Sequence, residues 1–158
     1  MRIGRIVSGG QTGVDLAALD AALALGVPCG GWVPRGRCNE DGPIAPHYPV
    51  RESGSPNPAQ RTARNVRDSD ASLILSRGPL SGGSALTERL AREHGKPCFH
   101  LDLAAAPGNA ALERIRRWLA TLDGETLNIA GPRRSNDPEI YEIAYRVIVA
   151  VLRAKAEG

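Results

Sequence analysis

Lysine is scarce in this sequence, because Lys96 and Lys155 are the only lysines among twenty basic residues. All other basic residues are arginines, whose planar guanidinium suits bidentate contacts with phosphate or carboxylate groups. A GC-rich genome produces the same bias, so the position of each arginine matters more than their number. The formal net charge of +3 is small and dispersed, which excludes a protein that binds nucleic acid by charge alone.

Long apolar runs are also lacking. No run approaches the length that crosses a bilayer, and Met1 leads directly into a strand-like segment without the pattern of a signal peptide. We therefore expect a cytoplasmic protein with no membrane partner. Its 158 residues, 42% of them apolar, suit one globular domain with its own core, residues 1–158.

Cysteine and histidine occur without the spacing that chemistry requires. The three cysteines are separated by long, unequal intervals: Cys29, Cys38 and Cys98. This pattern fits neither a disulfide framework nor a CxxC metal site. The three histidines are scattered as well, at His47, His94 and His100. The sequence therefore predicts no metal site and no Ser-His-Asp nucleophile.

Strand-like and helix-like segments alternate along the chain. Strands are predicted over Arg2–Ser8, Cys29–Val33, Ala71–Ser76, Pro97–Leu101 and Thr126–Ala130. Helices are predicted over Val14–Leu25, Ala59–Arg67, Ser84–His94, Asn109–Leu122 and Pro138–Lys155. We expect Pro34–Pro49 to be a long loop without regular structure. The alternation predicts an α/β fold, a single Rossmann-like, doubly wound, mainly parallel sheet with helices on both faces.

Ligands of such sheets bind beyond the carboxyl ends of the strands, where three sequence clusters fall. The first, Ser8–Gly13, is a glycine-rich turn before a helix, and we expect its free backbone N–H groups to cradle a phosphate. A turn needed only for packing is the alternative. The cluster is not a P-loop, because no Gly-Lys-Ser/Thr follows. Arg35 and Arg37 follow the second strand, where a dinucleotide site would carry an acid, which argues against ordinary NAD binding.

Two further clusters show related chemistry. Ser81–Glu88 again places glycines and hydroxyl groups at the start of a helix. Gly131–Ser135 places Arg133 and Arg134 at a strand end. We expect at least one of these arginines to contact the ligand, and an aspartate at Gly10 or Gly83 to block ligand binding while leaving the fold intact.

Five segments together resemble the bacterial molybdenum-cofactor carrier proteins: SGGQTGVDLAALDAAL, GGWVPRGRCNEDGPI, RTARNVRDSDASLIL, GGSALTERLAREHGKPC and LNIAGPRRS. The resemblance spans nearly the whole chain. It implies a Rossmann-like fold related to the lysine-decarboxylase-like, or LOG, proteins with circularly permuted chain order. It also implies binding, storage or protection of molybdenum cofactor (molybdopterin), a pterin with a terminal phosphate, without chemical turnover. A nucleotide is the alternative ligand.

The resemblance further implies which residues bind the cofactor: Gly9, Gly10, Gln11, Thr12, Gly13, Arg35, Gly82, Gly83, Ser84, Thr87 and Arg133. Implied partners are further copies of the chain in a homo-oligomer, a tetramer, and molybdoenzymes or cofactor-biosynthesis proteins. One departure is visible, since Arg134 stands where the family pattern has Glu after Gly-Pro-Arg.

An enzyme related to the phosphoribohydrolases, or a nucleotide-derivative sensor, is the competing hypothesis. The hydrolase signature Pro-Gly-Gly-x-Gly-Thr-x-x-Glu is not matched, because Arg89 occupies the position of the acid and Glu88 lies one residue early on the helix. Asp15 and Glu40 remain as acids, although a helix N-terminus and a solvated loop explain them equally simply.

Three other features have two interpretations. Arg61 either reaches a ligand or belongs to a solvated helix face. Trp32 either stacks on a flat ring or packs in the apolar core. The last predicted helix is apolar on two faces, which indicates a second subunit as one of its partners.

Overall fold

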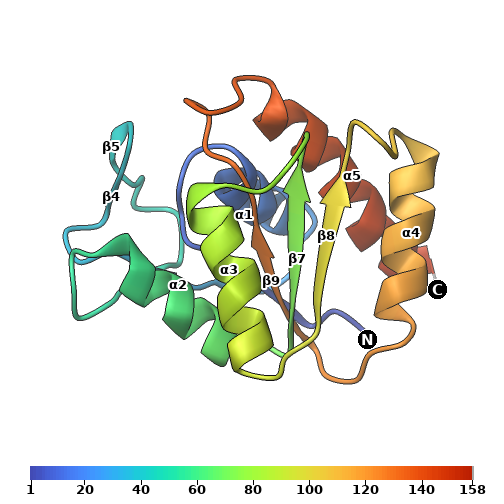
Figure 1. Cartoon of the computed structure of the whole chain (residues 1–158), viewed down its shortest axis with the longest axis horizontal. Helices are drawn as coiled ribbons and strands as arrows, with labels where there is room; N and C mark the ends of the chain where they lie inside the picture. Colours follow the sequence, from blue (N-terminus) through green and yellow to red (C-terminus); the bar gives the residue numbers. More distant parts are fainter. Residues whose placement is uncertain (158) are drawn as a thin grey trace.

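The computed structural model describes residues 1–157, with side chains described up to residue 154. Five parallel strands form the central sheet in the order β2-β1-β9-β7-β8, and Figure 1 shows the neighbours β9, β7 and β8. These strands are β1 (Arg5–Val7), β2 (Cys29–Gly30), β7 (Ala71–Ser76), β8 (Cys98–Asp102) and β9 (Thr126–Ala130). The predicted α/β fold with a doubly wound parallel sheet is confirmed.

Helices cover both faces of the sheet (Figure 1). One layer consists of α1 (Val14–Ala24), α4 (Asn109–Leu119) and α5 (Ile140–Glu157). The opposite layer consists of α2 (Pro58–Arg67) and α3 (Gly82–Glu93). None of the helices in the described part of the chain combines the length and the hydrophobicity that crossing a bilayer requires.

The two faces of the sheet differ in polarity. Leu73, Leu75 and Ile129 point toward the α1, α4 and α5 layer and belong to one buried apolar cluster with it. Their neighbours Ser72 and Asn128 are also buried but lie on the opposite face, where the Asn128 amide Nδ2 donates to Ser72 Oγ at 3.1 Å. This polar face, toward α2 and α3, is the one on which a ligand site can form.

The second strand is shorter than predicted. Cys29–Val33 divides into β2 and β3 (Trp32–Val33), and β3 leaves the central sheet to pair with β6 (Arg51–Glu52). Gly31 lies between them with φ +125°, and an added Cβ would lie 2.3 Å from the Ser8 carbonyl oxygen. The close approach of β1 therefore requires glycine here and turns the chain out of the sheet.

The prediction of an irregular loop over Pro34–Pro49 is wrong in part, because β4 (Cys38–Asn39) and β5 (Gly42–Pro43) form a short antiparallel hairpin. The Arg37 guanidinium holds the surrounding loop together. It donates to four backbone carbonyl oxygens at 2.8–3.3 Å, those of Ile44, Ala45, Tyr48 and Val50. The Arg37 side chain thus satisfies loop carbonyl oxygens that strand pairing would satisfy in a regular sheet.

Element ends differ from the predicted ends by a few residues, and one such difference affects the candidate site. Helix α3 begins at Gly82, two residues before the predicted start at Ser84. Gly82 and Gly83 therefore belong to the first helical turn, where backbone N–H groups have no intrahelical acceptor.

Candidate functional site

A cleft of about 260 Å³ lies at the carboxyl ends of β1, β7 and β9. The loops that follow these strands form part of its lining, and the start of α3 and one side of α2 complete it. The lining residues are Gly9, Gln11, Asp15, Pro58, Arg61, Thr62, Asn65, Ser81, Gly82, Gly83, Ser84, Thr87, Asn128, Ala130, Gly131, Pro132, Arg133 and Asn136. The cleft occupies the position at which doubly wound sheets bind ligands.

The N-terminus of α3 presents unused hydrogen-bond donors to this cleft. The backbone N–H groups of Gly82, Gly83 and Ser84 have no acceptor among the described residues, and the Ser81 side chain does not cap the helix. A Cβ added at Gly82 or Gly83 would meet no atom within 4 Å, so the space before these groups is open. Free N–H groups and the helix dipole together favour an anion.

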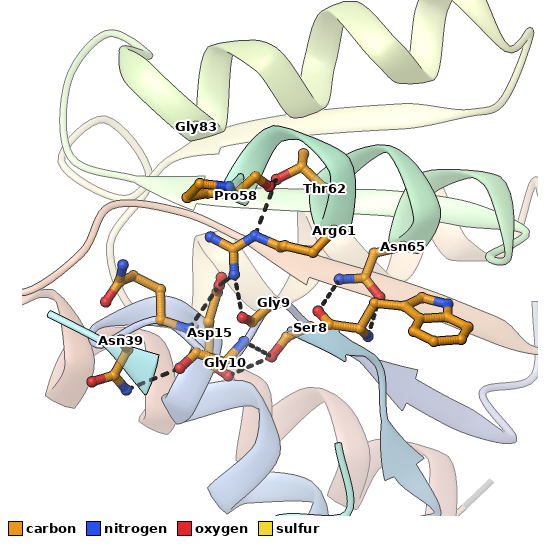
Figure 2. Close-up of polar contacts among 12 residues, drawn as sticks. Ser8, Gly9, Gly10, Asp15, Asn39, Pro58, Arg61, Thr62, Asn65 and Gly83 are labelled. Atoms are coloured by element: carbon orange, nitrogen blue, oxygen red, sulfur yellow. Dashed lines mark hydrogen bonds and ion pairs between the residues drawn. The ribbon is translucent and has the colours of Figure 1, made fainter. Parts of the chain in front are cut away.

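Arg61 supplies a positive charge beside this turn. Asn57 caps α2 by accepting from Ala59 N at 3.0 Å, and the helix then directs Arg61 toward Gly9 and Asp15 (Figure 2). The Arg61 guanidinium donates to the Gly9 carbonyl oxygen, and its side chain is only 12% exposed. A Cβ at Gly9 would lie 2.3 Å from Arg61 Nη1, so glycine leaves the space that the guanidinium occupies. Arg61 is therefore a cleft residue rather than part of a solvated face.

Asp15 is a buried carboxyl group in the same cleft. Its Oδ2 accepts from the Gln11 N–H at 3.2 Å and lies 3.9 Å from Arg61 Nη1. Burial raises the pKa of Asp15 to about 6, although Arg61 and the Gln11 N–H both favour the charged form. Asp15 does lie in the first turn of α1, as expected, yet it also brings a group that titrates near neutral pH to the cleft.

The first glycine-rich loop offers fewer free N–H groups than its sequence predicts. Gly10 N–H donates to Ser8 Oγ, Gln11 N–H to Asp15, and Thr12 N–H to Gln11 Oε1. Val14 N–H donates to the Pro132 carbonyl oxygen at 3.3 Å. Most donors of this loop are thus taken up within the protein, and the Gly13 N–H is the one in Gly10–Val14 without an acceptor among the described residues. A phosphate cradle in this loop stays a prediction, with fewer free donors than the sequence indicates.

The loop after β9 places one arginine at the cleft and turns the next one away. Arg133 lines the cleft with its side chain 51% exposed, and its Nε lies 3.7 Å from Glu40 Oε2. Arg134 forms an ion pair with Asp41 and does not line the cleft. Arg134, the residue that departs from the family pattern, thus makes its ion pair with Asp41 at the surface and not in the cleft.

Glu40 holds this loop against the first one. It accepts hydrogen bonds from Ser135 Oγ at 2.5 Å, from Ser135 N–H at 3.0 Å and from Thr12 Oγ1. The hydrogen bonds from Ser135 and Thr12 lower the pKa of Glu40 to about 2. Glu40 is therefore an ionised residue that joins the two loops, although it is exposed, as a loop position predicts.

Seven of the eleven predicted binding residues meet at the cleft: Gly9, Gln11, Gly82, Gly83, Ser84, Thr87 and Arg133. The other four, Gly10, Thr12, Gly13 and Arg35, do not line it. Gly10 packs against Val33, and Gly13 packs against the Pro132 carbonyl oxygen. Thr12 is buried against Glu40, and the Arg35 guanidinium extends to the Gly54 carbonyl oxygen at 3.5 Å.

Two asparagines that line the cleft, Asn128 and Asn136, were not predicted from the sequence. A third, Asn65, belongs to the segment RTARNVRDSDASLIL, which the family resemblance places beside the cleft, and it does line the cleft. A signal existed for Asn128, because it interrupts the apolar strand Leu127–Ala130 at the position facing away from the main core. A polar side chain buried in a central strand indicates either a network or a site. Asn136 reaches the cleft through tertiary packing that local patterns do not encode.

The residues considered for catalysis lie mostly elsewhere. Glu88 and Arg89 are on the outer side of α3, paired with Arg92 and Glu93, and neither lines the cleft. His100 Nε2 does lie 2.6 Å from Ser76 Oγ, a contact that the sequence spacing does not show. Ser76 is only 1% exposed, so this pair ties β7 to β8. Among the described residues, no three His, Cys, Asp or Glu side chains are placed to hold a metal ion.

Strand order and cleft position define a Rossmann-like α/β protein with a cleft at the carboxyl ends of its strands, and comparisons with known proteins agree. Residues 6–152 match the family of circularly permutated YpsA SLOG proteins, and the chain belongs to this family. The structure is also similar to the crystal structure of the "putative molybdenum carrier protein" from Syntrophus aciditrophicus SB, with TM-score 0.93, 45% sequence identity and 96% of each chain covered. No protein of curated function shows a significant match. The resemblance predicted from the sequence is confirmed.

Proposed function

We propose that this protein binds molybdenum cofactor in the cleft and stores or protects it without chemical turnover. The observation that carries the proposal is the unsatisfied first turn of α3, which faces a cleft that also contains Arg61. A terminal phosphate is the ligand group that such a turn binds best. The name of the 45% identical relative from Syntrophus aciditrophicus supports a molybdenum-related ligand.

The cleft residues fit both halves of the cofactor. The N–H groups of Gly82, Gly83 and Ser84 would hold the phosphate, with Arg61 and Arg133 contributing positive charge. The side-chain nitrogens of Asn136 (Nδ2) and Gln11 (Nε2) donate no hydrogen bond within the described part of the chain. Both side chains can therefore pair with the polar edge of a pterin ring.

The proposal is tested by purifying the protein from a molybdenum-replete host under anaerobic conditions. Metal analysis and the fluorescence of oxidised pterin are measured on the bound fraction. We expect molybdenum and pterin in equal amounts, and neither in a Gly83→Asp variant purified in parallel. A bound nucleotide without metal would contradict the proposal and favour a nucleotide-derivative sensor.

Hydrolysis of a nucleoside monophosphate is a second candidate function, because Asp15 is a buried cleft carboxyl with a pKa raised to about 6. Such a pKa suits a general acid at neutral pH. The carrier proposal predicts that AMP releases no free adenine in the presence of the protein. Adenine release with turnover, abolished in Asp15→Asn, would overturn the carrier proposal in favour of a phosphoribohydrolase.

We also propose that the protein is a cytoplasmic homo-oligomer, a tetramer, assembled partly through α5. Ile143, Val147 and Val149 on this helix are only partly buried, and the adjacent α1 exposes 42% of Leu23. Burial of such a surface in a second copy would stabilise the assembly. Light scattering at micromolar concentration tests this proposal, and a monomeric mass would contradict it.

A further inference from the structure

A second cavity, of about 230 Å³, lies on the same polar face of the sheet as the cleft. Residues of β1, β3 and β6, the start of β9, and the C-terminal part of α2 with the adjoining residues line it: Arg5, Val7, Gly31, Trp32, Arg51, Asn65, Asp68 and Thr126. Asn65 borders both the cleft and this cavity, and no other residue lines both. We call it the Trp32 cavity.

The Trp32 cavity carries uncompensated positive charge. Arg5 and Arg51 line it, and neither side chain has an ion-pair or hydrogen-bond partner among the described residues. Asp68 is the single carboxylate of the lining, and its oxygens already accept from Arg67 Nε at 2.9 Å and from Trp32 Nε1 at 2.8 Å. Unpaired guanidinium groups in a concave site favour an anionic ligand.

Trp32 forms a fixed flat surface in this cavity. Its backbone N–H donates to Asn65 Oδ1 at 2.8 Å, and its carbonyl oxygen accepts from Asn65 Nδ2 at 3.0 Å. The Arg64 guanidinium carbon lies 3.9 Å from the ring centroid, and that of Arg51 lies 4.8 Å from it. Trp32 is thus neither a core residue nor a cleft residue, but the centre of a separate aromatic and guanidinium surface.

We infer that the Trp32 cavity is a second binding site, which takes a small organic phosphate carrying a flat ring, a ligand of the nucleoside monophosphate class. Arg5 and Arg51 supply charge for the phosphate, and Thr126 adds a side-chain hydroxyl at the cavity. The guanidinium groups of Arg51 and Arg64 lie over the indole ring and form with it the layered surface on which a flat ring would stack. This inference does not depend on which ligand occupies the cleft.

The test uses AMP as the probe and the fluorescence of Trp32 as the signal. The chain has two tryptophans, so a Trp118→Phe background makes Trp32 the only source of indole emission. We expect saturable quenching by AMP, weakened about tenfold in Arg51→Ala and in Arg5→Ala. Arg146→Ala is the matched control, because that arginine pairs with Glu142 on the outer side of α5.

Binding at the two sites is separated by adding Gly83→Asp, which blocks the cleft. The Trp32 signal should persist in this variant with unchanged affinity, and circular dichroism confirms the fold of each variant. Three results would overturn the inference: no quenching by AMP, quenching that Gly83→Asp removes, or quenching that both cavity variants retain at parental affinity. Saturable binding of a polyglutamate peptide in place of AMP would point instead to an acidic protein partner and would also overturn it.

Discussion

The two glycine-rich loops of this protein are similar in sequence and differ in hydrogen bonding and packing. Ser8–Gly13 and the segment leading into Gly82–Ser84 each follow a strand and begin a helix. In the first loop, internal acceptors take the N–H groups of Gly10, Gln11 and Thr12. In the second, the N–H groups of the first helical turn have no protein acceptor. A glycine motif therefore predicts a tight backbone, whereas free donors depend on what surrounds it.

The space around the glycines differs in the same way. A Cβ at Gly10 would lie 2.7 Å from Val33 Cγ1, in a residue with φ +72°. A Cβ at Gly83 would meet no atom within 4 Å, and the backbone there is not left-handed. The first loop needs glycine for packing, while the second leaves room for a ligand. The same substitution in each loop should separate these roles.

Gly10→Asp should give the largest effect, a loss of about 4–5 kcal/mol in the free energy of unfolding. The new side chain would adopt a strained backbone, overlap Val33 and bury a charge. The sequence suggested that this variant would fold normally, and the geometry at Gly10 removes that expectation. Urea denaturation followed by circular dichroism measures the change. A loss below about 1 kcal/mol would show that the first loop is not closed by packing.

Gly83→Asp should leave the stability within about 1 kcal/mol of the parent and remove ligand binding. A carboxylate at the start of α3 would repel a phosphate and fill its space, so affinity should fall by about 100-fold or more, roughly 3 kcal/mol. Titration calorimetry with purified molybdenum cofactor measures the loss.

Gly83→Ala is the matched control, because a methyl group fits there without contact. It should keep most of the affinity. Parental affinity in a folded Gly83→Asp variant would mean that the ligand does not bind at this helix.

The contrast between the loops also shows how far the sequence predicts this molecule. Periodicity predicted the order and type of the ten main elements, because buried strands such as Ala71–Ser76 and amphipathic helices have strong local patterns. It placed Gly82, Gly83 and Ser84 at the cleft, since loops after parallel strands meet at one edge of the sheet. It could not show that Asp15 would accept the Gln11 N–H, that Arg37 would order its loop, or that Arg61 would point inward. Each of these contacts joins groups whose distance and orientation only the folded chain determines.

Asp15→Asn tests the closed loop through its pH dependence. The folded state raises the pKa of Asp15 from its ordinary value of 3.8 to about 6, so the protonated form stabilises the fold. That contribution is complete below pH 4 and is lost as the pH rises through 6. Relative to Asp15→Asn, the parent should therefore lose about 3 kcal/mol between pH 4 and pH 8.

Asp70→Asn provides the control with the opposite sign. Hydrogen bonds from the Thr126 and Glu125 N–H groups lower the pKa of Asp70, so its contribution is present at neutral pH and is lost as the pH falls. Urea denaturation across this pH range measures both differences. A pH-independent difference for Asp15→Asn would mean that its carboxyl group is not desolvated.

The smallest effect is expected at the rim, where Arg133 and the neighbouring Arg134 separate a ligand contact from a surface contact. Arg133 lines the cleft but is half exposed and close to Glu40, so solvent and that carboxylate both weaken its attraction for an anion. Arg133→Ala should therefore reduce affinity by about 1 kcal/mol, roughly fivefold, without changing the fold. Arg134→Ala should leave affinity unchanged, because its guanidinium is bound to Asp41 outside the cleft. Calorimetric titrations of both variants at low and moderate salt measure these losses. A charge contact weakens as the salt concentration rises, so the difference in affinity between the two variants should become smaller at moderate salt. Equal losses in both variants would show that the ligand senses only the general charge of this loop and that Arg133 makes no contact of its own.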